Sequence, residues 1–143
     1  MAEERYRAVG PRIHPLHAFL LAASVPLFLG ALLSDITYAN SYEIQWTNFA
    51  SWLLVGALVF SGFALLWSLI DLFRADRSWR GAPLIAFVIL LAAWVLGFID
   101  ALVHAKDAWA KMPEALILSI IVTILAIVPT WLGFSAWRSG EVK

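Results

Sequence analysis

Residues 83–104 read PLIAFVILLAAWVLGFIDALVH, an almost unbroken run of apolar residues. Crossing the roughly 30 Å hydrocarbon core of a bilayer takes about 20 mostly apolar residues in a helix. The stretch meets this length with Asp100 as its one acidic residue. Its apolar residues do not alternate with polar ones, as a membrane β-barrel strand would require. We therefore predict a helix, because a backbone in hydrocarbon must satisfy its own hydrogen bonds.

Three further segments share this character, and short polar intervals separate them. The four predicted spans are residues 16–34, 49–72, 83–104 and 114–137. Short connections make consecutive helices antiparallel neighbours. The sequence therefore predicts an all-α membrane protein, an antiparallel four-transmembrane-helix bundle that forms a single domain over residues 1–143.

The composition supports a membrane protein and excludes several other classes. Of the 143 residues 62% are hydrophobic and 14% are charged, and the mean hydropathy is +0.83. Soluble domains carry roughly 25% charged residues, and disordered chains need low hydrophobicity. Ten basic residues balance ten acidic ones, so no affinity for nucleic acid is expected. The absence of cysteine from the sequence excludes disulfides and thiolate metal sites.

The cations are distributed unequally between the two sides of the membrane. The predicted topology puts both termini and the middle connection on one side, and eight of the ten cations lie there: Arg5, Arg7, Arg12, Arg74, Arg77, Arg80, Arg138 and Lys143. The other side carries Lys106 and Lys111. Since cytoplasmic loops are enriched in Lys and Arg, we predict that both termini are cytoplasmic.

Small and polar residues recur at helical spacing in every span. Such stripes indicate where helices approach one another in lipid. The members are His17, Ser24, Ala31 and Asp35; Ala57, Ser61, Ala64, Ser68 and Asp71; Ala86, Ala93, Gly97, Asp100 and His104; and Ser119, Thr123, Ala126, Thr130 and Gly133. We expect these stripes to face the bundle interior and the Leu, Ile, Val and Phe residues to face lipid.

The topology brings four ionisable residues to the outer side. Asp35 ends the first span, Asp100 and His104 end the third, and Glu114 begins the fourth. Asp100 and His104 are four residues apart and share a helix face. Three carboxylates and an imidazole suit a divalent metal, proton or substrate handling, or a hydrogen-bonded polar cap with a loop lysine as counterion. These alternatives stay open.

A second candidate site lies on the inner side and comprises His14, His17 and Asp71. If Pro15 is the first helical residue, His14 becomes a cap and only His17 faces the interior. Interfacial histidines bonded to Asp71 are one interpretation; a metal, haem or quinone site is the other. His17 and His104 are expected at opposite ends, so they cannot share one metal or haem within a monomer.

No catalytic motif accompanies these sites. The sequence lacks a G-x-S-x-G turn, an H-E-x-x-H pair, a phosphate-binding loop and a dinucleotide fingerprint. The connections are also too short to hold a catalytic domain. The sequence therefore favours a non-enzymatic protein.

Short polar motifs at the ends of the first two spans resemble a known family. The motifs are His14-Pro15-Leu16-His17, Ser34-Asp35, Tyr38 and Asp71. Over about residues 11–137 the chain resembles the bacterial membrane-protein family called domain of unknown function 2231. The resemblance implies a four-helix, multi-pass protein of the bacterial inner membrane. Because members look like neighbours of membrane redox systems, it also implies a respiratory accessory role.

Together these observations predict an accessory or anchoring subunit of a larger membrane assembly. Its expected partners are the lipid bilayer and either other membrane subunits or further copies of itself. Two alternatives remain. One is metal or proton handling at Asp35, Asp100, His104 and Glu114. The other is electron transfer through a haem or quinone bound near His14, His17 and Asp71.

Overall fold

The computed structural model describes residues 13–74, 81–107 and 110–139. Four helices fill these ranges, which contain no strand: α1 (Pro15–Ser41), α2 (Ile44–Arg74), α3 (Gly81–His104) and α4 (Glu114–Ser139). Each is long and apolar enough to span a membrane. The predicted all-α, four-span architecture is therefore confirmed.

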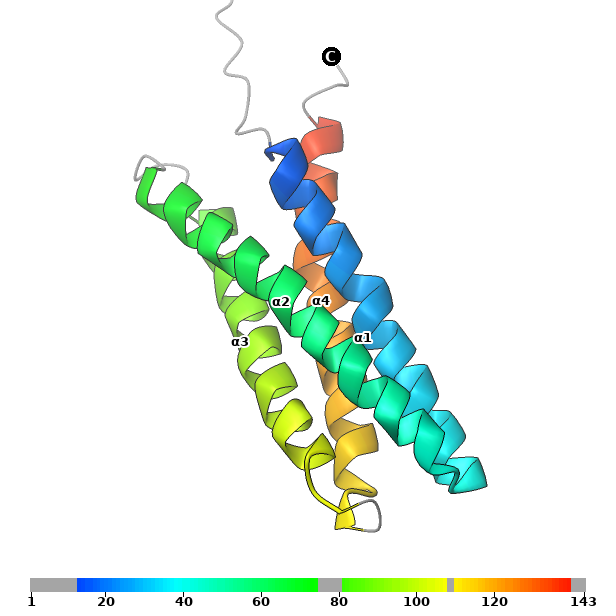
Figure 1. The fold of residues 1–143 in the computed structure, drawn as a ribbon. Coiled ribbons are helices and arrows are strands. Elements are labelled where there is room, and N and C mark those ends of the chain that lie inside the picture. Colours follow the sequence, from blue (N-terminus) through cyan, green and yellow to red (C-terminus); the bar gives the residue numbers. More distant parts are fainter. Residues whose placement is uncertain (1–12, 75–80, 108–109, 140–143) are drawn as a thin grey trace, which may run out of the picture.

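The helices run antiparallel in chain order and form one bundle (Figure 1). α1 begins and α4 ends at one end of the bundle, which we call the terminal end. The connections from α1 to α2 and from α3 to α4 lie at the opposite end, which we call the loop end. Around the bundle, α1 packs on α2 and α4, and α3 packs on α2 and α4. The diagonal pairs, α1 with α3 and α2 with α4, make the fewest contacts.

α1 continues two turns beyond its predicted end. The interval 35–48, predicted as a loop, is nearly all helical, with a break only at Tyr42–Glu43. Polar side chains in the last turns of α1 each bond the carbonyl four residues earlier, which satisfies them within the helix: Ser34, Thr37, Asn40 and Ser41. The helix ends where Tyr42 adopts a left-handed conformation with φ 56° and its N–H bonds the Tyr38 carbonyl.

Most members of the predicted small-residue stripes lie in the interior, but those near the terminal end are only partly buried: Ser68, Asp71, Ala86, Thr130 and Gly133. Buried positions on α1 to α4 include Ala31, Ala57, Ala93 and Ala126. The large apolar side chains that remain exposed are spread over all four helices. This division follows from lipid being as apolar as leucine, so that helices meet largely through small and polar residues. The expectation that large apolar residues face lipid is wrong for Phe28, Leu54 and Val122, which fill the space between the helices.

The cations that support the predicted orientation lie mostly outside the described ranges. These are Arg5, Arg7, Arg12, Arg77, Arg80 and Lys143. Arg74 closes α2 at the terminal end. The cytoplasmic placement of both termini therefore stays a prediction.

Candidate functional site

Four side chains from three helices meet inside the bundle near its loop end. They are Asp35 on α1, Asp100 and His104 on α3, and Ser119 on α4, and we call them the acid–histidine cluster. Both aspartates are fully buried, and the histidine and serine are nearly so. An ionisable residue at such depth in a membrane bundle is costly unless it is paired, and it is a functional candidate for that reason.

The imidazole of His104 connects two helices that otherwise pack little. Its Nε2 lies 2.8 Å from Oδ1 of Asp35, across the diagonal from α3 to α1. Its Nδ1 lies 2.9 Å from the backbone carbonyl oxygen of Asp100 and 3.1 Å from Oδ1 of the same residue. The spacing of four residues puts Asp100 and His104 on one face of α3, as the sequence predicted.

The hydroxyl of Ser119 bridges the two carboxyl groups. Its Oγ lies 2.5 Å from Oδ2 of Asp35 and 2.9 Å from Oδ2 of Asp100. The other oxygen of Asp100, Oδ1, is buried and makes no hydrogen bond within the described part of the chain. The serine contacts the acids rather than the imidazole, so it is not arranged as a nucleophile activated by histidine.

Counting hydrogens identifies the protonation state that these distances require. Nδ1 of His104 faces a backbone carbonyl, which only accepts, so this nitrogen carries a hydrogen. The contact between Nε2 and Asp35 needs one further proton. Ser119 has a single hydrogen for two carboxyl neighbours, so a separate hydrogen bond to each of them requires one carboxyl to be protonated and to donate to Oγ.

Relative to two ionised acids and a neutral imidazole, one hydrogen in each of these contacts therefore requires two added protons. Those two protons cancel the two negative charges and leave the acid–histidine cluster neutral. A neutral state is the favoured one where water is excluded, because burying an unpaired charge costs far more than burying a hydrogen-bonded neutral group.

Lys111 covers the cluster on its loop side. The lysine lies on the connection between α3 and α4 and is 5% exposed. Its Nζ donates to Oγ1 of Thr47 at 2.8 Å and to the carbonyl of His104 at 3.0 Å. Burial lowers the pKa of Lys111, while the nearby charges of Asp35 and Asp107 act in the opposite direction.

Glu114 does not join the other predicted residues. It is exposed at the start of α4, and its Oε2 accepts from Nζ of Lys106 at 2.8 Å. No group of three or more His, Asp or Glu residues within the described ranges is arranged to hold a metal ion. The acid oxygens of the cluster face His104 and Ser119 instead.

A second polar group occupies the terminal end. His17 on α1 is nearly buried, and its Nε2 lies 3.0 Å from Oγ of Ser68 on α2. Its Nδ1 is 3.6 Å from Oδ2 of Asp71, which is too long for a hydrogen bond. The Asp71 side chain is 47% exposed. We call these three residues the terminal-end group.

His14 serves as the N-cap of α1 rather than facing the interior. Its Nδ1 accepts from the backbone N–H of Leu16 at 3.2 Å, and Pro15 occupies the first turn. Its ring packs at 4.7 Å from that of Trp67. Of the two arrangements that the sequence left open, the structure shows the one in which His17 alone faces inward. His17 and His104 lie at opposite ends of the bundle, as expected.

An apolar layer separates the two ends. It consists of Phe28, Leu54, Ala57, Val122 and Ala126, each at most 1% exposed. Gly97 makes room for it, because a Cβ on this glycine would lie 3.2 Å from the Phe28 ring and 3.3 Å from Leu58.

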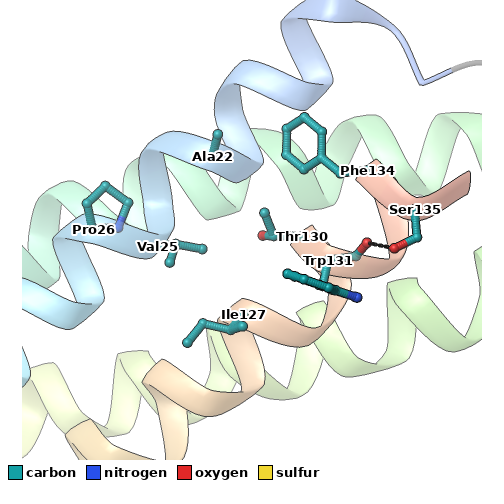
Figure 2. Close-up of a pocket in the computed structure, with 8 residues that line it drawn as sticks. All are labelled: Ala22, Val25, Pro26, Ile127, Thr130, Trp131, Phe134 and Ser135. Carbon is teal, nitrogen blue, oxygen red and sulfur yellow. Dashed lines mark hydrogen bonds between the residues drawn. The ribbon is translucent and has the colours of Figure 1, made fainter. Parts of the chain in front are cut away.

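A pocket of about 410 Å³ opens between α1 and α4 on the outer surface of the bundle (Figure 2). Its lining is mostly apolar and comprises Ala22, Val25, Pro26, Ile127, Thr130, Trp131, Phe134 and Ser135. No residue of the acid–histidine cluster or of the terminal-end group lines it. The pocket is therefore separate from the ionisable residues of both polar groups.

Sequence reasoning missed the bridging role of Ser119 and the burial of Lys111. Ser119 was recognised only as a member of a small-residue stripe. Lys111 was recognised as a loop cation that could neutralise an acid. Neither residue carries a motif, and both acquire their roles from the crossing of helices distant in sequence.

Comparison with known proteins gives a family. A family model described as "Predicted membrane protein (DUF2231)" matches residues 13–142. This range includes every residue of both polar groups and confirms the resemblance found in the sequence. No curated protein and no solved structure matches the chain.

Proposed function

The chain belongs to the DUF2231 family of predicted membrane proteins, and we propose that it binds and releases protons at the acid–histidine cluster. The observation that carries this proposal is the hydrogen count. The contacts among Asp35, Asp100, His104 and Ser119 are complete only with two protons added. Loss of those protons would leave two negative charges at a fully buried site.

The geometry favours protons over a metal as the occupant of this site. The polar atoms of the cluster lie at hydrogen-bond distance from one another. A divalent cation would need the same oxygens directed at a common point. The fourth predicted ligand, Glu114, is engaged with Lys106 on the surface.

The proposed setting is the bacterial inner membrane with both termini in the cytoplasm. Four apolar helices support a multi-pass membrane protein, and the cation asymmetry of the sequence supports the orientation. In this orientation the loop end faces away from the cytoplasm, and the cluster exchanges protons with that side.

An accessory or anchoring role in a larger assembly is compatible with proton binding. The connection from α1 to α2 is only a short break, and the described helices leave many large apolar side chains exposed. Such a surface suits lipid and the helices of other membrane subunits equally. Support for a haem or quinone near His14, His17 and Asp71 is weaker, because His14 caps α1 and His17 faces Ser68.

Infrared titration of the purified protein in lipid tests the proposal. We expect the carbonyl absorption of a protonated carboxyl group, lost reversibly as the pH is raised. The band should be weakened or shifted in Asp35→Asn and in Asp100→Asn, and absent from the double variant. Glu114→Gln is the matched control, since it removes an exposed carboxylate at the same end. A pH-indicating dye should count up to two protons released per chain. The proposal is wrong if no carboxyl band depends on Asp35 or Asp100.

A further inference from the structure

The acid–histidine cluster has different surroundings on its two sides. Toward the terminal end lies the apolar layer around Phe28, with Leu54 and Val122 fully buried beside it. Asp35 is seven residues from Phe28, a separation of about 10 Å along the helix. One buried hydroxyl lies at the edge of this layer: Thr123 Oγ1 contacts the backbone carbonyls of Ser119 at 2.7 Å and of Phe28 at 3.3 Å. The side chains of Phe28, Leu54 and Val122 beyond it are apolar and do not carry protons.

Toward the loop end the cover includes a charged side chain, Lys111, besides the buried Tyr38 one turn beyond Asp35 on α1. Lys111 is 5% exposed, which is unusual for lysine. Its ammonium links α2 to α3 by bonding Thr47 and the carbonyl of His104. His104 is the last residue of α3, so the cluster lies directly beneath this cover.

The groups that face Lys111 come from every neighbouring element. Asp35 on α1 and Asp107 on the same connection act on its charge. Thr47 on α2 and the carbonyl of His104 on α3 accept its hydrogens. From α4 the backbone N–H of Ala115 donates to the carbonyl of Lys111 at 2.8 Å, and Glu114 is paired with Lys106. Burial also lowers the pKa of Lys111, which means that holding its ammonium in this place costs free energy.

We infer that Lys111 is the gate through which the acid–histidine cluster exchanges protons with water at the loop end. This inference rests on the proposed function. The ammonium has two effects, and both oppose protonation of the cluster. It covers the route to Asp35, and its positive charge repels an approaching hydronium ion and opposes protonation of the acids beneath it.

Lys111→Met tests the gate, because methionine keeps much of the side-chain length and removes the charge. We expect the midpoint of the carboxyl titration to rise by about one pH unit and proton uptake to become about tenfold faster. Effects of about this size are expected when one unit charge is removed a few ångströms from an ionisable group. Lys111→Arg should resemble the wild type. Thr47→Val removes one acceptor and should speed uptake with little change in the titration midpoint.

The matched control is Lys106→Met, which removes an exposed cation from the same connection. The gate is overturned if Lys111→Met lowers thermal stability but leaves the titration midpoint and uptake rate unchanged, because that is a structural role alone. Equal effects of Lys106→Met would also overturn it, since they would reflect general surface charge. If the wild type shows no titrating carboxyl at all, the proposed function fails and the gate fails with it.

Discussion

The two ends of the bundle each pair a histidine with an aspartate, and they do so differently. At the loop end the His104 and Asp35 side chains are 1% and 0% exposed and 2.8 Å apart. At the terminal end the His17 and Asp71 side chains are 10% and 47% exposed and 3.6 Å apart. Residue type is the same in the two pairs. The two pairs differ in burial and in the number of helices that supply their hydrogen-bond partners.

The loop-end pair is held from three helices, whereas the terminal-end pair joins only two. Ser119 on α4 bonds both acids of the cluster, so neither carboxyl can turn toward water without breaking a contact. Asp71 has no such constraint. A buried polar group costs free energy when its partner is removed, while an exposed one is rehydrated.

The largest expected effect distinguishes the two ends by stability. Asp35→Ala removes the partner of His104 Nε2 and one of the two carboxyl partners of Ser119 in the interior. We therefore expect the free energy of unfolding to fall by about 3 kcal/mol. Asp71→Ala should lower the free energy of unfolding by less than about 1 kcal/mol. The Asp71 side chain is half exposed and lies 3.6 Å from Nδ1 of His17, so the interaction that is lost is weak. Reversible unfolding in mixed micelles measures both. Equal losses for the two variants would show that the ends are energetically alike.

A smaller effect concerns the layer that keeps the ends apart. Gly97→Ala would place a methyl group 3.2 Å from the Phe28 ring and 3.3 Å from Leu58. We expect a loss of about 1–2 kcal/mol from overpacking. Gly81→Ala is the control, since nothing lies within 4 Å of its position, and it should change stability by less than about 0.5 kcal/mol. An unchanged unfolding free energy for Gly97→Ala would mean that the side chains of Phe28 and Leu58 shift to accept the added methyl group at little cost.

The smallest effect is a pH dependence contributed by Lys111. Its pKa in the folded protein is lowered from the ordinary value of 10.5. Between the lowered value and 10.5 the unfolded chain still holds the proton that the folded protein has released. Stability should therefore rise as the pH increases through that window, and the cost of burying the ammonium is complete below it.

Unfolding free energies at about pH 8 and about pH 10 test this dependence, since the window lies below 10.5. Lys111→Met should abolish the rise that Lys111 contributes, and Lys106→Met should leave it in place. A steeper rise in Lys111→Met than in the wild type would contradict the assigned direction.

The helices and their interior faces follow from the sequence, because length and the spacing of small residues are local properties. The topology also predicts that Asp35, Asp100 and His104 meet at one end. Glu114 was grouped with them by depth alone, and depth does not determine the direction of a side chain in the first turn of a helix. Glu114 instead lies beside Lys106.

The end of α1 was misplaced for a related reason. A charged residue such as Asp35 normally marks the boundary of a hydrophobic span. Here partners on α3 and α4 satisfy the carboxylate inside the bundle, and the helix continues past it. Such partners are contributed by tertiary packing, so a single-chain hydropathy pattern does not contain them.

The diagonal contact between His104 and Asp35 has a mechanical consequence. α1 and α3 otherwise touch little, and the two acids that face each other across one hydroxyl belong to these same two helices. Ionising both acids would replace attraction by repulsion along that diagonal. Loss of both protons is therefore expected to push the loop ends of α1 and α3 apart.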